Sequence, residues 1–128
     1  MRRLFLFFVC CFFISVNVKA QFKTDEPYVA FVGVQSYEAI ITPADAMKGR
    51  ALGCMLNGAG LPVQSFKLTV EKNGSKKSAS STTNNMTAEQ IAMLQKLTSG
   101  SKIIFSEVKV KFQDGKIKTI KDGIYLIK

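Results

Sequence analysis

Side chains able to carry out chemistry are few in this 128-residue chain, and histidine is missing altogether. Without histidine there is no Ser-His-Asp or Cys-His nucleophile and no His-ligated metal. Ser99-Gly100-Ser101-Lys102 fits the S-x-x-K pattern of Ser/Lys nucleophiles, a pattern that opens a helix and is accompanied by S-D-N and K-T-G. Here it follows the helix expected over 88–97, and neither companion motif occurs. We therefore interpret it as a coincidence and expect no catalytic site and no enzymatic activity.

Cofactor and metal motifs are missing from the sequence as well. It contains no Walker A pattern, no G-x-G-x-x-G, no C-x-x-C and no Asp-rich calcium loop. We therefore expect neither a cofactor nor a metal ion. Cys54, between Gly53 and Met55, is interpreted as a small buried hydrophobic residue. The alternative for this cysteine is an intermolecular bridge.

Lysines near the C-terminus are the feature that suggests binding. The candidate partner-binding residues are Lys102, Lys109, Lys111, Lys116, Lys118 and Lys121. An anionic partner, such as an acidic protein, a charged glycan or lipid headgroups, would relieve the repulsion among them. The alternative is a solvated edge on which lysine discourages strand-to-strand aggregation. Nucleic acid is not an expected partner, because Arg50 is the only arginine outside the first 20 residues.

The first 20 residues have the layout of a secretory signal peptide. Arg2 and Arg3 precede the apolar run 4–16, and Val18-Lys19-Ala20 provides a cleavage site. The apolar run is shorter than the roughly 20 residues that a transmembrane helix needs, so a retained anchor is the less favoured alternative. Cleavage before Gln21 leaves 108 residues with 15 basic and 9 acidic side chains, and no integral membrane span is expected in them.

Short β-strands are expected along most of the remaining chain. In 65–71 apolar and polar residues alternate, which is typical of a half-buried strand. Asn73-Gly74 and Asp114-Gly115 predict two-residue hairpin turns. The second turn would pair Lys111 with Lys118, and the spacing of Ile117 and Ile120 indicates a bulge or bend near 118–120. Further strands are predicted over 28–34, 39–41, 51–56, 103–112 and 124–128.

One helix is strongly indicated, over 88–97. Thr87 and Gln90 have the spacing of a capping box, and Met86 and Ile91 that of a hydrophobic staple. The segment 42–49 carries the start and stop signals of a helix of one or two turns. About six to eight short strands with one short α-helix predict a mainly β fold, a small antiparallel β-sandwich formed by a single domain over 21–128.

Residues 65–128 also carry a series of motifs in a fixed order. The series consists of Ser65-Phe66-Lys67-Leu68-Thr69-Val70, Asn73-Gly74, Met86-Thr87-Ala88-Glu89-Gln90, Leu97-Thr98-Ser99-Gly100-Ser101-Lys102-Ile103-Ile104-Phe105 and Gln113-Asp114-Gly115-Lys116. In order and spacing it resembles the C-terminal domain of GldM, the gliding-motility protein of Bacteroidetes that is equivalent to PorM of type IX secretion. Residues 28–64 are similar to that domain more loosely.

The resemblance implies an all-β periplasmic interaction domain without catalytic residues. In GldM this domain ends a long periplasmic shaft that reaches from an inner-membrane motor toward outer-membrane ring components. Neither the membrane helix pair nor the shaft is expected here, so a motor role is not inferred. We expect a non-enzymatic, exported domain that docks on a cell-envelope protein in the periplasm or at the cell surface. The alternative is a basic β-domain that binds anionic glycan or lipid headgroups.

Overall fold

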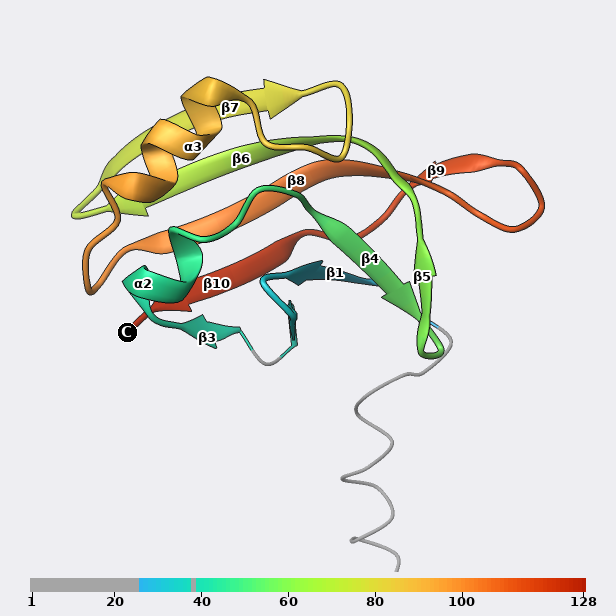
Figure 1. The fold of residues 1–128 in the computed structure, drawn as a ribbon, viewed down its shortest axis with the longest axis horizontal. Coiled ribbons are helices and arrows are strands. Elements are labelled where there is room, and N and C mark those ends of the chain that lie inside the picture. Colours follow the sequence, from blue (N-terminus) through green and yellow to red (C-terminus); the bar gives the residue numbers. More distant parts are fainter. Residues whose placement is uncertain (1–25, 38) are drawn as a thin grey trace, which may run out of the picture.

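The computed structural model describes residues 26–37 and 39–128, so the expected signal peptide lies outside the described residues. Two β-sheets and two short helices form a sandwich (Figure 1). The elements are β1 (Tyr28–Phe31), β2 (Val34–Gln35), β3 (Ile40–Ile41), α2 (Pro43–Ala46), β4 (Gly53–Leu56), β5 (Ala59–Leu61), β6 (Val63–Lys72), β7 (Ser75–Ser81), α3 (Ala88–Gln95), β8 (Lys102–Lys111), β9 (Ile117–Thr119) and β10 (Gly123–Ile127). The mainly β sandwich is confirmed, and in the described residues it has more strands than the six to eight expected.

The order of the strands divides them into a smaller and a larger sheet. The four-stranded sheet has the order β2-β1-β4-β5, and the six-stranded sheet has the order β3-β10-β8-β6-β7, with β9 also paired to β8. The pairing of β3 with β10 is parallel, which departs from the all-antiparallel expectation. In the described residues the chain crosses between the sheets on either side of β3, which belongs to the larger sheet, and again at Pro62, between β5 and β6.

Aromatic rings fill the space between the two sheets. Phe105 on β8 lies with its ring centroid 5.0 Å from Phe31, 5.9 Å from Phe66 and 5.8 Å from Tyr125. The Tyr125 hydroxyl accepts a hydrogen bond from the N–H of Phe31 at 3.1 Å and lies within bonding distance of the carbonyl of Val34. Because Tyr125 belongs to the larger sheet and Phe31 to the smaller one, this hydroxyl ties the two sheets together.

The β6–β7 hairpin confirms the predicted Asn-Gly turn. Asn73 and Gly74 have φ values of 53° and 84°, so both adopt the left-handed conformation that a two-residue hairpin turn requires. The expected strand 28–34, in contrast, is divided by a similar turn at Val32-Gly33, where φ is 46° and 81°. A β-branched residue such as Val32 rarely adopts positive φ, and therefore the sequence pattern indicated a continuous strand.

The capping box of α3 is confirmed in both of its hydrogen bonds. The N–H of Gln90 donates to Thr87 Oγ1 at 3.1 Å, and the N–H of Thr87 donates to Gln90 Oε1 at 2.9 Å. The buried Gln90 side chain also donates from Nε2 to the carbonyl of Ala79 on β7 at 2.9 Å. The cap therefore also attaches the helix to the sheet. The helix ends at Gln95, two residues before its predicted end.

Substitution of Thr87 by alanine is expected to lower the free energy of unfolding by about 0.5–2 kcal/mol, because the Gln90 N–H loses its acceptor. Thr87→Ser should be close to neutral, because serine keeps the accepting oxygen. Chemical denaturation of the two variants and the unmodified protein measures this difference. Equal stability of the Ala and Ser variants would show that the cap contributes nothing.

Candidate functional site

The candidate site is the hairpin formed by β8 and β9, which extends past the rest of the larger sheet (Figure 1). At its tip the N–H of Phe112 donates to the carbonyl of Lys116, and the N–H of Gly115 donates to the carbonyl of Phe112, both at 2.9 Å. Asp114 Oδ1 accepts the N–H of Lys116 at 3.0 Å. These bonds form a compact turn and fix the backbone from which the neighbouring lysines project.

The pairing of β8 with β9 differs from the predicted register by one residue. Lys111 lies opposite Ile117, and Lys118 lies opposite Val110. The expected pairing of Lys111 with Lys118 was therefore wrong. The turn contains one more residue than a two-residue hairpin, and a shift of one residue places the two lysines on opposite faces.

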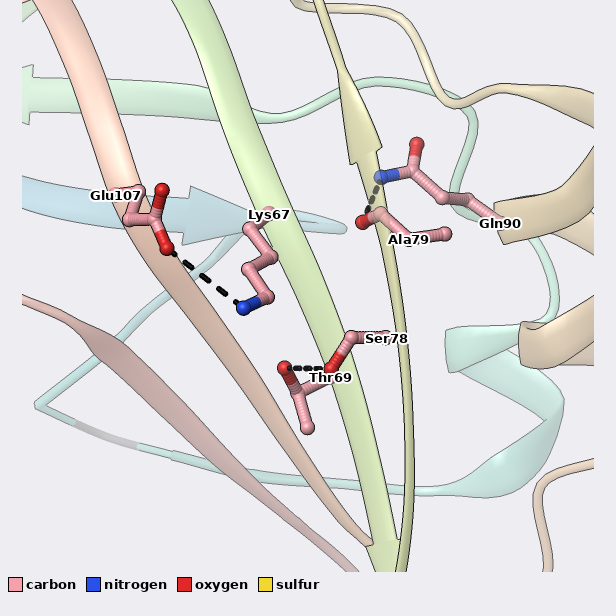
Figure 2. Close-up of polar contacts among 6 residues, drawn as sticks. All are labelled: Lys67, Thr69, Ser78, Ala79, Gln90 and Glu107. Carbon is pink, nitrogen blue, oxygen red and sulfur yellow. Dashed lines mark hydrogen bonds and ion pairs between the residues drawn. The ribbon is translucent and has the colours of Figure 1, made fainter.

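A β-bulge at Glu107 decides which face the hairpin lysines occupy. Glu107 has φ +51°, and together with Val108 it lies opposite the single residue Phe66 of β6. Figure 2 shows the Glu107 carboxylate directed toward Lys67, 3.7 Å away. Beyond the bulge the inward positions change from Ile103 and Phe105 to Val108 and Val110, which places Lys109 and Lys111 on the outer face.

The predicted bend in the return strand is present, slightly further along the chain than expected. β9 ends at Thr119, and β10 begins at Gly123. Both strands pair with β8, and the register of the pairing is the same before and after the interruption. Ile120 and Gly123 are both buried although they are three residues apart. The interruption lies opposite the Glu107 bulge, so both strands change their inward face at the same place.

The six candidate lysines do not form one patch. Lys102 lies nine residues before Lys111 on β8, a distance on the order of 30 Å along a strand, and its Nζ is 3.9 Å from Glu71. Lys121 Nζ lies 2.7 Å from Glu26 and 5.0 Å from the centre of the Tyr28 ring. The hydrogen bond to Glu26 raises the pKa of Lys121.

The other four lysines belong to the hairpin itself and are called here the hairpin lysines: Lys109, Lys111, Lys116 and Lys118. Over residues 26–37 and 39–128, the ion pairs of lysine with carboxylates involve Lys67, Lys76, Lys102 and Lys121, and none of the hairpin lysines. Lys118 Nζ instead lies 5.1 Å above the centre of the Phe112 ring. The structure thus separates two candidate lysines that form ion pairs from four that form none within the described residues.

A pocket of about 240 Å³ lies beside β9. Its apolar lining comes from Pro27, Phe112 and Ile120, and its charged lining from Glu26, Lys118 and Lys121. Sequence reasoning missed this pocket because Glu26 and Pro27 come from the other end of the chain. No spacing within the sequence brings them beside the hairpin.

The outer face of the larger sheet carries an apolar strip that was also missed. Ile40, Ile124 and Leu126 are 59%, 43% and 48% exposed, and Leu126 lies directly opposite Ile40. Further along the same face the pattern becomes polar, with Thr69 Oγ1 and Ser78 Oγ 2.9 Å apart (Figure 2). The alternation in 123–127 was a usable signal, because Tyr125 and Ile127 are buried while Ile124 and Leu126 are exposed.

Cys54 is buried on β4, as its favoured interpretation predicted. Burial raises the pKa of its thiol to about 11. The reactive species is the thiolate, which an unfolded cysteine forms with a pKa of about 8.5. The native thiol therefore stays protonated at pH values where the unfolded one ionises.

For the chain from residue 21 onward, thiol labelling at pH 8 to 9 should be slow in the native state and fast in denaturant. The unfolded chain loses the proton first as pH rises, so stability linked to Cys54 should fall above about pH 8.5. Labelling rates with and without denaturant test the prediction. Fast labelling of the native protein, without unfolding, would contradict burial of this thiol.

Within residues 26–37 and 39–128, no group of three or more Cys, Asp or Glu side chains is arranged to hold a metal ion. In the same part of the chain, neither helix is long and apolar enough to cross a bilayer.

Comparison with protein families supplies the decisive observation. The family model described as GldM C-terminal domain matches residues 26–126. The chain belongs to the GldM C-terminal domain family. The match includes residues 28–64, where the sequence resemblance was loose, and extends through the hairpin and into β10. A search of the curated proteins finds no match.

Membership in the GldM C-terminal domain family associates the chain with gliding motility and type IX secretion, and so with the cell envelope. The suspected resemblance is thereby confirmed.

Proposed function

We propose that the chain is a non-catalytic, exported docking domain that binds a cell-envelope protein in a gliding or type IX secretion setting. The observation that carries the proposal is the projecting β8–β9 hairpin, whose four hairpin lysines form no ion pair within the described residues. Four positive charges on one hairpin create a local positive potential, which would attract an acidic partner surface. Membership in the GldM C-terminal domain family supports a role in protein–protein contacts.

The absence of catalysis is part of the proposal. The sequence provides no histidine to act as a general base. Cys54 is buried and its pKa is raised, which opposes its use as a nucleophile. Ser99 and Lys102 of the S-x-x-K pattern lie after the helix rather than at its start, and the Lys102 ammonium lies 3.9 Å from Glu71.

A second candidate function uses the same hairpin lysines for an anionic glycan or lipid headgroup. It is favoured by their charge and by their position on a projecting hairpin. Binding to such a ligand would depend on charge alone and would weaken steeply as salt rises. Binding to a protein would include apolar contacts that persist in salt.

Amine cross-linking in envelope extract tests the docking proposal. The chain from residue 21 onward is incubated with the extract, cross-linked and mapped by mass spectrometry. We expect cross-links from the hairpin lysines to one envelope protein, and far fewer from Lys76 and Lys77. These two lie on β7, which β6 separates from β8, and serve as the internal control. Cross-links concentrated on β7, or saturable binding to anionic vesicles without any protein partner, would contradict the proposal.

Removal of residues 1–20 on export gives a separate prediction about the mass of the exported protein. The mass of protein recovered from the periplasm or the medium should correspond to a chain that begins at Gln21, because Val18-Lys19-Ala20 places a small residue before the cleavage point. Intact-mass spectrometry measures this directly. A species that retains Met1 and needs detergent for extraction would indicate an anchor.

A further inference from the structure

The outer edge of β9 presents backbone hydrogen-bonding groups. The N–H of Ile120 donates to the carbonyl of Val108, and the N–H of Phe112 donates to the carbonyl of Lys116. In an antiparallel ladder the bonded pairs alternate with non-bonded ones, so the N–H and C=O groups of Ile117 and Thr119 point away from β8. In the described residues β8 is the only strand paired with β9. The edge is therefore open to an additional strand.

The pocket of about 240 Å³ lies along this same edge. Lys118, Thr119 and Ile120 form one wall, and Phe112 and Pro27 add apolar surface. Side chains of an added strand would alternate between the two faces of the hairpin. One of these side chains would enter the pocket. The side chains before and after it would lie on the other face of the hairpin, beside Lys109 and Lys111. An open edge with a side-chain pocket next to it is the arrangement used in peptide recognition by strand addition.

Charge indicates what kind of strand the edge would accept. The hairpin lysines flank β9 on both faces, and the acid of the tip, Asp114, accepts a backbone N–H within the turn. The edge of β7 differs, because Lys76 on that strand already lies 3.4 Å from Glu71. Opposite charge favours an incoming acidic segment at β9 and excludes a basic one.

We propose that β9 binds an extended acidic segment of the partner protein as an additional strand, with one apolar side chain of that segment in the pocket beside Phe112. This inference rests on the proposed docking function and specifies the partner's chemistry. Main-chain bonds to Ile117 and Thr119 hold the segment, Lys118 and its neighbours attract its acids, and the pocket selects its apolar residue.

The test uses a fluorescent eight-residue peptide with glutamate at every second position. The positions between the glutamates are valine, except for one central phenylalanine. Binding to the chain from residue 21 onward is measured by anisotropy, and backbone contact by hydrogen exchange. The amides of Ile117 and Thr119 should exchange more slowly when the peptide is bound. Thr119→Pro removes the outward N–H without removing a bond to β8 and should weaken binding more than tenfold. Thr119→Val keeps the N–H and the branched shape, so its loss of affinity should be far smaller than that of the proline variant. Lys77→Ser, on the separate strand β7, should leave the affinity unchanged.

Peptide variants keep the test valid if the proline variant does not fold. N-methylation of alternate peptide amides should abolish binding to the unmodified protein, and serine in place of the phenylalanine should weaken it. A peptide with lysine in place of glutamate should not bind. Unchanged affinity after N-methylation, or protection at β7 in place of β9, would overturn the inference. If the envelope partner still cross-links to the hairpin lysines in that case, the docking function stands and only strand addition is wrong.

Discussion

Phe105→Ala is expected to lower the free energy of unfolding by about 3–5 kcal/mol. Phe105 is fully buried, and its ring contacts Phe31 of the smaller sheet as well as Phe66 and Tyr125 of the larger one. Truncation removes the apolar surface that the ring buries and leaves a cavity where three other rings meet. Because the four rings come from four strands, the cavity cannot close without shifting one sheet against the other.

Two variants control for the size and the position of this change. Phe105→Leu keeps most of the buried volume and should cost clearly less than the alanine variant. Ile104→Ala changes the adjacent residue on the partly exposed outer face and should have a small effect. Urea unfolding followed by circular dichroism measures all three. Similar losses for Ile104→Ala and Phe105→Ala would show that the aromatic cluster is not the centre of the core.

Replacement of all four hairpin lysines by serine is expected to weaken binding of the envelope partner more than tenfold at low salt. The substitution removes four positive charges from one hairpin, and at about 0.01 M salt charges act over roughly 30 Å. The four side chains are exposed, so their loss should leave the fold intact. Titration of the purified partner at two salt concentrations measures the effect. The difference in affinity between the four-lysine variant and the unmodified protein should shrink as salt rises.

Matched variants separate the site from general charge and from stability. Lys76→Ser with Lys77→Ser removes charge from β7 and should change affinity little. Val70→Ala removes a partly buried residue that packs against the core and should lower stability while leaving the affinity of the folded fraction unchanged. Normal binding by the four-lysine variant at every salt concentration would make the hairpin a solubility device and place the binding site elsewhere.

Much of the local structure could be predicted because it depends on residues close together in the chain. The capping box joins positions three residues apart, and both of its bonds are present. The Asn73-Gly74 turn needs two residues that tolerate positive φ. The alternation in 65–71 needs no knowledge of the partner strands, and Phe66 and Leu68 are indeed buried.

For the candidate site, the sequence predicted which residue types are involved but not how they are grouped in space. The sequence identified six lysines, but their grouping depends on pairing across strands. Lys102 and Lys121 are compensated by Glu71 and Glu26, and Glu26 is 95 positions from its partner. Charge spacing along the chain contains no information about such contacts.

By itself the sequence determined the mainly β class, the cap of α3, the Asn-Gly hairpin and the supply of unbalanced lysines. Only the tertiary structure decided the register of β8 with β9, the bulge at Glu107 and the pocket beside β9. These depend on which strands become neighbours and on a single extra residue in a turn or strand. A change of one residue exchanges the two faces of a strand, so small local differences decide which side chains meet a partner and which meet the core.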